Sequence, residues 1–157
     1  MYKILFLLFK IFITYSFFSC TPHVQTNARH MPKQGIEGYV YRISGNQMPS
    51  PDVKPIPPKG ISTFLYIYEL TNLSQVQRQG QSAFYYSIPS KLITRIETDT
   101  NGYFKINLPA GRYSLFVKKD KLFFANWFDK DNNIAPVEVL PGKFSKVEFR
   151  VDYDAVY

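Results

Sequence analysis

From Gly35 to Tyr153 apolar and polar residues mostly alternate with a period of two, which is typical of β-strands that bury one face. The predicted strands cover residues 35–43, 61–70, 83–88, 91–98, 103–108, 112–119, 121–128, 135–140 and 144–153. No stretch with a helical period is longer than about ten residues. A series of short strands separated by turns, about seven or more in number, predicts an all-β fold, an antiparallel sandwich.

Turn residues separate these strands. Residues 44–60 contain five prolines and predict a loop of polyproline character, whereas the polar residues 71–82 predict a loop or a short helix. Asn101-Gly102 is the strongest hairpin signal in the chain, because both residues tolerate positive φ. Pro109-Ala110-Gly111 and Pro141-Gly142 predict two further turns.

The chain before Gly35 has a different pattern. Met1-Tyr2-Lys3 precedes an apolar run over residues 4–18, and Ser19 then precedes Cys20, the only cysteine among 157 residues. A basic start, an apolar core and a small residue at the end are typical of a secretory signal. Residues 21–34 have no apolar period and contain two prolines, which predicts a flexible tether.

The end of the apolar run resembles a bacterial lipobox, the recognition sequence of lipoprotein signal peptidase. That sequence has Leu, a small residue and then Gly, Ala or Ser before the cysteine. Ser19 fits, Phe17 is an apolar substitute and Phe18 departs from the pattern. The resemblance implies signal cleavage between Ser19 and Cys20 and a lipid, such as palmitate, on Cys20. The expected organisation is a signal peptide at 1–19, a tether at 20–34 and the sandwich at 35–157.

A membrane-spanning helix explains the N-terminal segment less well. Such a helix needs about 20 apolar residues, whereas this run is shorter and contains Lys10. A charge at the middle of the membrane costs about 2.5–3.5 kcal/mol. An ordinary secreted protein, an uncleaved anchor and a cytoplasmic chain stay open as alternatives. The lipobox favours a protein attached to a membrane of the cell envelope through the lipid on Cys20.

Charge argues against one class of partner. The chain has 19 Lys and Arg and 12 Asp and Glu; loss of residues 1–19 removes Lys3 and Lys10, which leaves 17 against 12 and a net charge of +5. The basic residues are scattered, and an acid interrupts the one dense group, residues 118–121. Nucleic-acid-binding proteins usually concentrate basic residues on one face, so we expect no nucleic-acid partner.

One stretch carries a family resemblance. Residues 98–115 (TDTNGYFKINLPAGRYSL) resemble the motif of the carboxypeptidase regulatory-like domain, TD-x-x-G-x-F, then L-P-x-G-x-Y-x-L. Gly38-Tyr39-Val40 resembles its opening strand, and residues 137–139 and 147–151 resemble its closing hairpin. The resemblance implies an Ig-like, transthyretin-like sandwich. Lipoproteins that carry one such domain are most similar to those of the Bacteroidetes.

The same motif has a physical interpretation. The Asp99 carboxylate is placed to accept hydrogen bonds from backbone amides of the turn, and Gly102 to adopt the left-handed conformation. Phe104, Ile106 and Leu108 alternate toward the core, as do Tyr113, Leu115 and Val117. Tyr113 is expected to donate a hydrogen bond to the backbone across the corner.

The chain lacks the side chains of most hydrolytic sites. Its two histidines, His23 and His30, lie in the tether, so the predicted sandwich has neither a histidine base nor a cysteine. A serine triad or a closed zinc site is therefore not expected, and an uncharacterised hydrolase is the disfavoured alternative. Asp129, Asp131 and Asn133 match the start of a calcium loop, but Ile134 stands where glycine is needed. We expect no cofactor, and these three residues are only weak candidates for a metal site.

Acidic and aromatic residues offer further candidates. Spacing selects no catalytic pair among the strand glutamates, which are expected to face solvent: Glu37, Glu69, Glu97, Glu138 and Glu148. Consecutive aromatics on a strand point to opposite faces, so one of Tyr85-Tyr86 and one of Phe123-Phe124 should point outward. The candidate binding residues are Trp127, Tyr86 and Phe124.

Together these features favour a lipid-anchored, non-catalytic binding or scaffolding module. Its expected partners are the membrane, through Cys20, and an envelope protein or a glycan. Similar domains precede the plugs of TonB-dependent transporters, so an accessory role in outer-membrane uptake or surface assembly is the alternative. Surface-exported lipoproteins of the Bacteroidetes carry acids soon after the cysteine. The first acid here is Glu37, so we expect attachment to the outer membrane facing the periplasm.

Overall fold

The structure of this protein is a computed structural model, which describes residues 33–49, 51 and 56–157. The predicted signal peptide, Cys20 and the tether up to residue 32 lie outside the described residues. Gln34, the last residue of the predicted tether, is buried against the sandwich. Its side-chain Oε1 accepts a hydrogen bond from Gly142 N at 3.0 Å, and its carbonyl accepts one from Leu108 N at 3.2 Å. The folded part therefore begins before Gly35.

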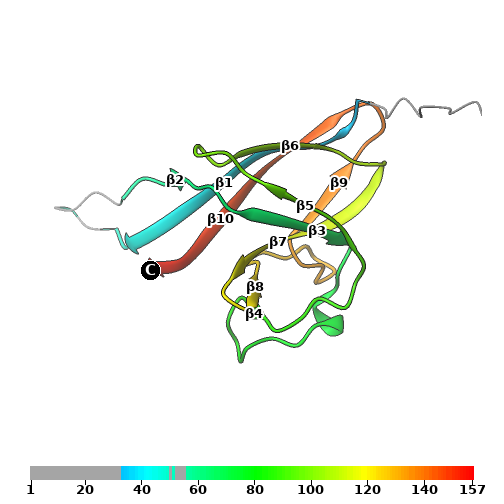
Figure 1. The fold of residues 1–157 in the computed structure, drawn as a ribbon. Helices are drawn as coiled ribbons and strands as arrows, with labels where there is room; N and C mark the ends of the chain where they lie inside the picture. Colours follow the sequence, from blue (N-terminus) through cyan, green and yellow to red (C-terminus); the bar gives the residue numbers. More distant parts are fainter. Residues whose placement is uncertain (1–32, 50, 52–55) are drawn as a thin grey trace, which may run out of the picture.

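The described residues form two β-sheets, which confirms the predicted all-β sandwich (Figure 1). The strands are β1 (Gly35–Asn46), β2 (Lys59–Gly60), β3 (Phe64–Glu69), β4 (Phe84–Tyr85), β5 (Leu92–Glu97), β6 (Tyr103–Asn107), β7 (Gly111–Lys119), β8 (Leu122–Phe124), β9 (Pro136–Val139) and β10 (Phe144–Val156). A 3₁₀ helix, η1 (Leu73–Gln75), lies in the segment for which a loop or a short helix was predicted. None of the helical structure in the described part has the length and apolar character needed to cross a membrane.

Sheet A contains β10, β1, β2 and β6. The long strand β1 pairs with β10 along one side and with β6 and β2 along the other. Sheet B has the order β4-β8-β7-β3-β5, and β9 also pairs with β7. The short strand β2 pairs Lys59 with Arg42 and Gly60 with Tyr41, inside the segment predicted to be only a loop.

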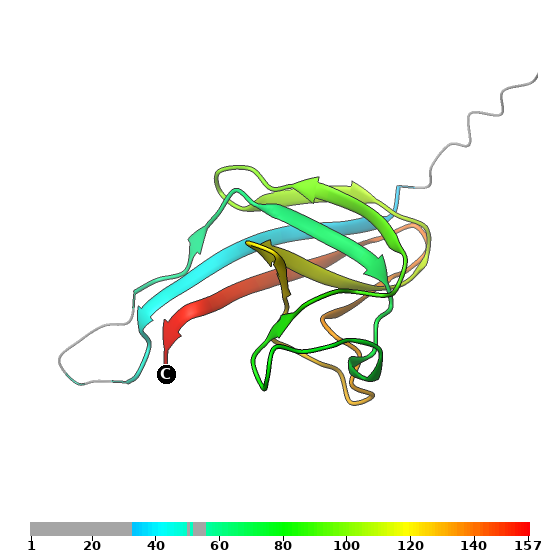
Figure 2. The ribbon, with the colours of Figure 1, turned by 60° about the horizontal axis from the view of Figure 1, so that its bottom comes forward.

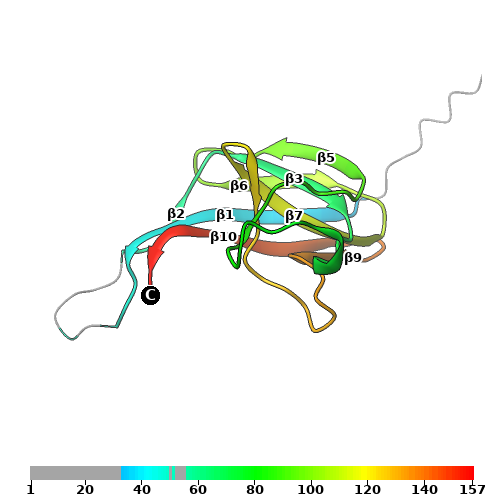
Figure 3. The same ribbon diagram turned by 90° about the horizontal axis from the view of Figure 1, so that it is seen from below.

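One strand pair differs from the predicted antiparallel arrangement, because β1 and β10 run parallel from Gly35 beside Phe144 to Asn46 beside Val156. A parallel pair needs a long connection, and almost the whole domain separates these two strands. Figures 2 and 3 show the two strands side by side, with their C-terminal ends running past the edge of sheet B. Both strands are three residues longer than predicted.

The prediction of a closing hairpin formed by residues 137–139 and 147–151 is also wrong, because these two strands do not pair with each other. β9 pairs with β7 in sheet B, whereas β10 pairs with β1 in sheet A. The turn at Pro141-Gly142 therefore carries the chain from one sheet to the other, and the hydroxyl of Ser145 hydrogen-bonds the carbonyl of Glu138 across it. Alternation of apolar residues marks both segments as strands, but it does not say which strand each one pairs with.

The turn at Asn101-Gly102 likewise connects the two sheets and does not close a hairpin, because β5 belongs to sheet B and β6 to sheet A. Asp99 Oδ1 accepts hydrogen bonds from the amides of Asn101 and Tyr103, each at 2.8 Å, as predicted. Gly102 has φ +81°, and the amide of Val40 donates to its carbonyl at 2.8 Å. A Cβ at Gly102 would collide with the carbonyl oxygen of Val40, so the glycine lets the turn lie directly on β1.

The core lies between the inner faces of the two sheets. Sheet A contributes Ile36, Val40, Phe104, Phe149 and Val151, and sheet B contributes Leu65, Ile67, Leu115, Val117 and Phe124. Each fully buried aliphatic or aromatic side chain contributes about 1.5–3 kcal/mol. The predicted inward alternation of Phe104, Leu108, Tyr113, Leu115 and Val117 is confirmed, while Ile106 is half-buried.

A second apolar layer covers part of the outer face of sheet B. The segment between β3 and β5, green in Figure 1, folds over this face and buries Tyr85, Tyr68 and Phe116. The Tyr85 and Tyr68 rings meet the Phe116 ring edge to face, at centroid distances of 5.9 and 5.7 Å. Because of this cover, β7 is buried on both faces, including Ser114 and Phe116.

Candidate functional site

Two of the three predicted binding residues are poor candidates in the structure. Phe124 is 2% exposed and packs in the core against Phe84 and Tyr153, so that prediction is wrong. Its neighbour Phe123 is the one that points to the outer side of sheet B. Tyr86 is 50% exposed and Tyr85 is fully buried, as the alternation predicts, but Tyr86 lines neither the groove beside Trp127 nor the pocket beside Tyr39.

Trp127 lies beside β10. Its ring is half-buried and packs edge to face on Phe149, with 4.8 Å between the ring centroids. It lines an open groove of about 500 Å³ together with Arg150, Asp152 and Tyr157. The side chain of neighbouring Asn126 donates to Asp152 Oδ1 at 2.6 Å. Trp127 thus closes one edge of the core and leaves part of its ring in the groove.

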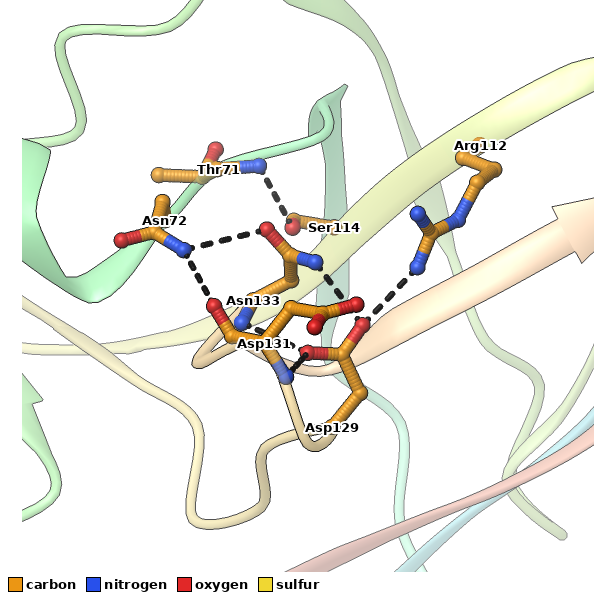
Figure 4. A network of polar contacts seen from close by, with 7 residues as sticks. All are labelled: Thr71, Asn72, Arg112, Ser114, Asp129, Asp131 and Asn133. Carbon is orange, nitrogen blue, oxygen red and sulfur yellow. Dashed lines mark hydrogen bonds and ion pairs between the residues drawn. The ribbon is translucent and has the colours of Figure 1, made fainter.

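The weak metal candidates form a structural turn (Figure 4). Asp129 Oδ1 accepts hydrogen bonds from the backbone amides of Asp131, at 2.9 Å, and Asn133, at 2.8 Å. Asp129 Oδ2 accepts hydrogen bonds from the side-chain Nδ2 of Asn133 and from a guanidinium nitrogen of Arg112, each at 2.8 Å. These bonds, the one from the Asn133 side chain first, hold the pKa of Asp129 below its ordinary value of 3.8. Both carboxylate oxygens are thus used by donors within the protein.

This turn is tied to the segment after β3 (Figure 4). The side chain of Asn72 donates to Asp131 O at 2.7 Å and to Asn133 Oδ1 at 3.2 Å. The amide of Thr71 donates to the hydroxyl of buried Ser114 at 2.9 Å. Within 33–49, 51 and 56–157, no three His, Cys, Asp or Glu side chains gather closely enough to hold a metal ion. The network in Figure 4 therefore holds loops in place.

The structure brings together three other aromatic residues that the sequence did not single out. Tyr39 and Tyr41 project from the outer face of β1, and Tyr103 projects from β6 directly beside Tyr39. The rings of Tyr39 and Tyr41 lie nearly parallel, at 15° and 5.6 Å, and the Tyr103 ring meets Tyr39 at 58° and 5.4 Å. We call Tyr39, Tyr41 and Tyr103 the tyrosine platform.

Charged residues surround one side of the tyrosine platform. In the neighbouring row of sheet A, Glu37 on β1 lies between Lys105 on β6 and Lys146 on β10. Lys105 Nζ donates to Glu37 Oε2 at 2.7 Å, which raises the pKa of Lys105, and it lies 4.1 Å from the centroid of the Phe144 ring. Glu148 on β10 lies beside Tyr39. Two ammonium groups thus flank Glu37 across the strands, and the second carboxylate, that of Glu148, lies 3.7 Å from an Arg150 nitrogen.

A shallow pocket of about 510 Å³ opens between the tyrosine platform and these charges. Tyr39 and Tyr103 form its aromatic side, and Glu37, Lys146 and Glu148 form its polar side. Gly38 and Val147 also line it. The two strands approach closely there, so a Cβ on Gly38 would collide with the carbonyl oxygen of Val147. The pocket is within the range of volumes typical of small-ligand sites.

One sequence signal pointed to this site without identifying it. Tyr39 and Tyr41 are two residues apart on a strand and therefore share a face. The alternation left either Tyr39 or Val40 as the inward residue, and the structure buries Val40 completely. Tyr103 and Glu148 join Tyr39 only through the pairing of three strands that are far apart in the sequence.

Comparison of the chain with protein-family models, with curated proteins and with solved structures finds no match in any of the three.

Proposed function

We propose that this protein is a non-catalytic binding module of the cell envelope, held at a membrane by a lipid on Cys20, and that the tyrosine platform is its ligand surface. The tyrosine platform and its pocket carry this proposal. Tyr39 is 39% exposed although its ring would gain free energy from burial. Clustered, partly exposed aromatic rings beside a pocket are typical of binding surfaces.

The proposed anchor suits a binding role. Gln34 is fixed at the N-terminal end of β1, and residues 21–33 separate it from Cys20. A flexible segment of this length would span about 20 Å. The tyrosine platform lies on the outer face of sheet A, away from both ends of β1. A tethered sandwich can therefore turn this face toward a ligand. We place it on the outer membrane, facing the periplasm, as the residues after Cys20 favour.

Two observations support a role without catalysis. The chain has its histidines and its cysteine only at positions 20, 23 and 30, before the first strand, β1. The carboxylate of Asp129 accepts a hydrogen bond from the backbone amide of Asn133 in a turn. The carboxylate of Asp154 forms ion pairs with Arg42 at 2.6 Å and with Lys119 at 3.3 Å. These acids have the environment of structural ion pairs and turn caps, in which a carboxylate stays ionised.

Membership of the carboxypeptidase regulatory-like family is part of the proposal. This membership is supported by the positions of four motif residues, which form the turns between the two sheets. Asp99 and Gly102 build the turn from sheet B to sheet A, and Pro109 and Tyr113 build the return to sheet B. Each of these four motif residues thus has a role in the fold, whereas Tyr103 of the ligand surface occupies a variable position of the motif, between Gly102 and Phe104.

Photo-crosslinking in intact cells tests the proposed surface. A benzophenone amino acid replaces Tyr103 in the full-length chain, and a matched control carries it at Phe64, an exposed aromatic position on the outer face of sheet B. We expect an adduct of higher mass after irradiation only for position 103, since this position lines the pocket. Equal adduct formation at the two positions, or none at position 103, would contradict the proposal.

A further inference from the structure

We propose that the pocket beside the tyrosine platform binds a pyranose unit of a neutral carbohydrate. This inference rests on the proposed function, because it names the ligand class of the same surface. It follows from three features of the pocket: a partly exposed aromatic ring, carboxylates that have basic partners, and hydrogen-bonding groups of both kinds.

The aromatic feature is the ring of Tyr39. Tyr41 stacks on it at 15°, and Tyr103 leans on it at 58°, so neighbouring rings hold its orientation. The remaining surface of the Tyr39 ring contributes to the pocket wall. The face of an aromatic ring carries partial negative charge, and the C–H bonds on one face of a pyranose carry partial positive charge. A sugar ring can therefore stack on Tyr39 without losing the hydrogen bonds of its hydroxyl groups.

Charges of both signs surround the pocket. Each carboxylate of its lining has a basic partner, because Lys105 Nζ lies 2.7 Å from Glu37 and an Arg150 nitrogen lies 3.7 Å from Glu148, and Lys146 adds an ammonium group to the lining. The carboxylates accept hydrogen bonds and the ammonium groups donate them. A hydroxyl group both donates and accepts, and a pyranose presents several of them around its edge. This arrangement suits a neutral, polyhydroxylated ligand.

The outer face of sheet B lacks this combination, although aromatic residues lie there too. The guanidinium of Arg95 lies 5.0 Å from the centroid of the Phe64 ring, and Lys118 Nζ lies 5.0 Å from that of Phe123. Each of these cations occupies one face of its ring, which leaves less ring surface for a sugar. On sheet A the corresponding cation, Lys105, lies over Phe144 and not over a residue of the tyrosine platform. Phe64 is therefore a matched control for Tyr39.

Isothermal titration calorimetry tests the ligand class. The full-length chain is purified in a polyoxyethylene detergent, which contains no sugar, and is titrated with maltopentaose, cellopentaose, laminaripentaose and chitopentaose. We expect at least one of these to bind, with an affinity that Tyr39→Ala lowers roughly tenfold and that Phe64→Ala leaves unchanged. Binding of none, or equal loss in both variants, would overturn the inference.

A second pair of variants separates recognition from folding. The side chain of Glu148 is 62% exposed and lies 3.7 Å from Arg150, so its replacement should leave the fold intact. Glu148→Gln is expected to weaken oligosaccharide binding severalfold, whereas Arg150→Gln is expected to have little effect. If both change the affinity equally, the ion pair and not the pocket would be responsible, and the inference would fail.

The charge argument has its own test. Choline and polygalacturonate are titrated into the same protein as a cationic and an anionic probe. Binding of either one without binding of a neutral oligosaccharide would show that the tyrosine platform recognises charge, which contradicts the inference. An adduct at position 103 in cells would in that case still support the proposed ligand surface, so the two proposals fail separately.

Discussion

The hydroxyl group of Tyr113 donates a hydrogen bond of 2.9 Å to the backbone carbonyl of Pro109, four residues earlier. Pro109 lies in the turn that carries the chain from β6 in sheet A to β7 in sheet B. Burial raises the pKa of the Tyr113 hydroxyl above its ordinary value of 10.0, so it remains a donor at neutral pH. The bond fixes the corner between the two sheets, as the sequence predicted.

Loss of this hydrogen bond should destabilise the sandwich. In Tyr113→Phe the ring still fills its place in the core, but the carbonyl of Pro109 loses its partner. We expect the free energy of unfolding to fall by about 1 kcal/mol and the melting temperature by about 4 °C. Trp127, the only tryptophan, reports unfolding by fluorescence because it packs on Phe149. The exposed Tyr86→Phe is the control, and an equal effect in both variants would contradict this role.

Glycine at position 102 should be essential for a steric reason. Gly102→Ala places a methyl group against the carbonyl oxygen of Val40 and strains a residue whose φ is +81°. We expect it to cost more than about 3 kcal/mol of stability, because the collision adds to backbone strain of about 1–3 kcal/mol. Gly80→Ala is the matched control, since Gly80 also has positive φ but its new methyl group would have no other atom within 4 Å. Urea unfolding should show a much smaller loss there.

Asp129 should make the stability of the protein depend on pH. Its pKa is lower in the folded state than its ordinary value of 3.8, first because of the hydrogen bond from Asn133. A depressed carboxyl pKa stabilises the folded state above the unfolded pKa, and this stabilisation is lost as the pH falls through the folded pKa. The wild type should therefore be more stable than Asp129→Asn at pH 7, and the difference should shrink below about pH 4.

The control for this prediction is Asp131→Asn. The hydrogen bonds of Asp131 in the turn are made by its backbone amide and carbonyl. Its replacement should therefore change stability little at either pH. Urea midpoints at pH 7 and pH 3 for the three proteins measure both effects. A difference between wild type and Asp129→Asn that stays constant with pH would show that the carboxylate charge is not what stabilises the turn.

The sequence predicted the strands better than their partners. Period-two alternation located the segments of β1, β6, β7 and β10, because one face of each is buried. Pairing depends on residues far apart in the chain, so the parallel pair of β1 and β10 was missed. Asn101-Gly102 correctly marked a left-handed residue, but positive φ does not reveal whether a turn joins partners or crosses between sheets.

The site was less predictable than the fold for the same reason. The choice of Phe124 failed because the sequence places Phe123 and Phe124 on opposite faces without saying which face is covered. Tyr39, Tyr103 and Glu148 become neighbours only through the pairing of β6, β1 and β10. The spacing from Asp129 to Asn133 resembles a calcium loop, but here the Asp129 carboxylate accepts hydrogen bonds from the backbone amides of a turn. Turns of this kind and calcium loops both favour Asp and Asn, so the sequence alone does not distinguish them.

The proposed lipid anchor predicts that the location of the protein can be changed without changing its folding. In the proposed organisation Cys20 precedes the sandwich by a tether, so we expect Cys20→Ser to leave the melting temperature of the sandwich unchanged. Each methylene of an acyl chain contributes about 0.8 kcal/mol to membrane binding when it is buried. A protein without acyl chains should therefore leave the membrane fraction. Fractionation and metabolic labelling with palmitate measure this outcome. If Cys20→Ser stays in the membrane fraction, the lipoprotein interpretation is wrong.

Protection of the tyrosine platform in native membranes is the most direct test of the account. Lys146→Cys places a thiol in the pocket, and Arg95→Cys places one on the outer face of sheet B. The wild-type chain, which has only Cys20, gives the background. We predict that a maleimide labels position 146 at least twofold more slowly in native membranes than in purified protein, while position 95 reacts equally in both. Equal labelling of position 146 in the two preparations would contradict the claim that this face binds a ligand.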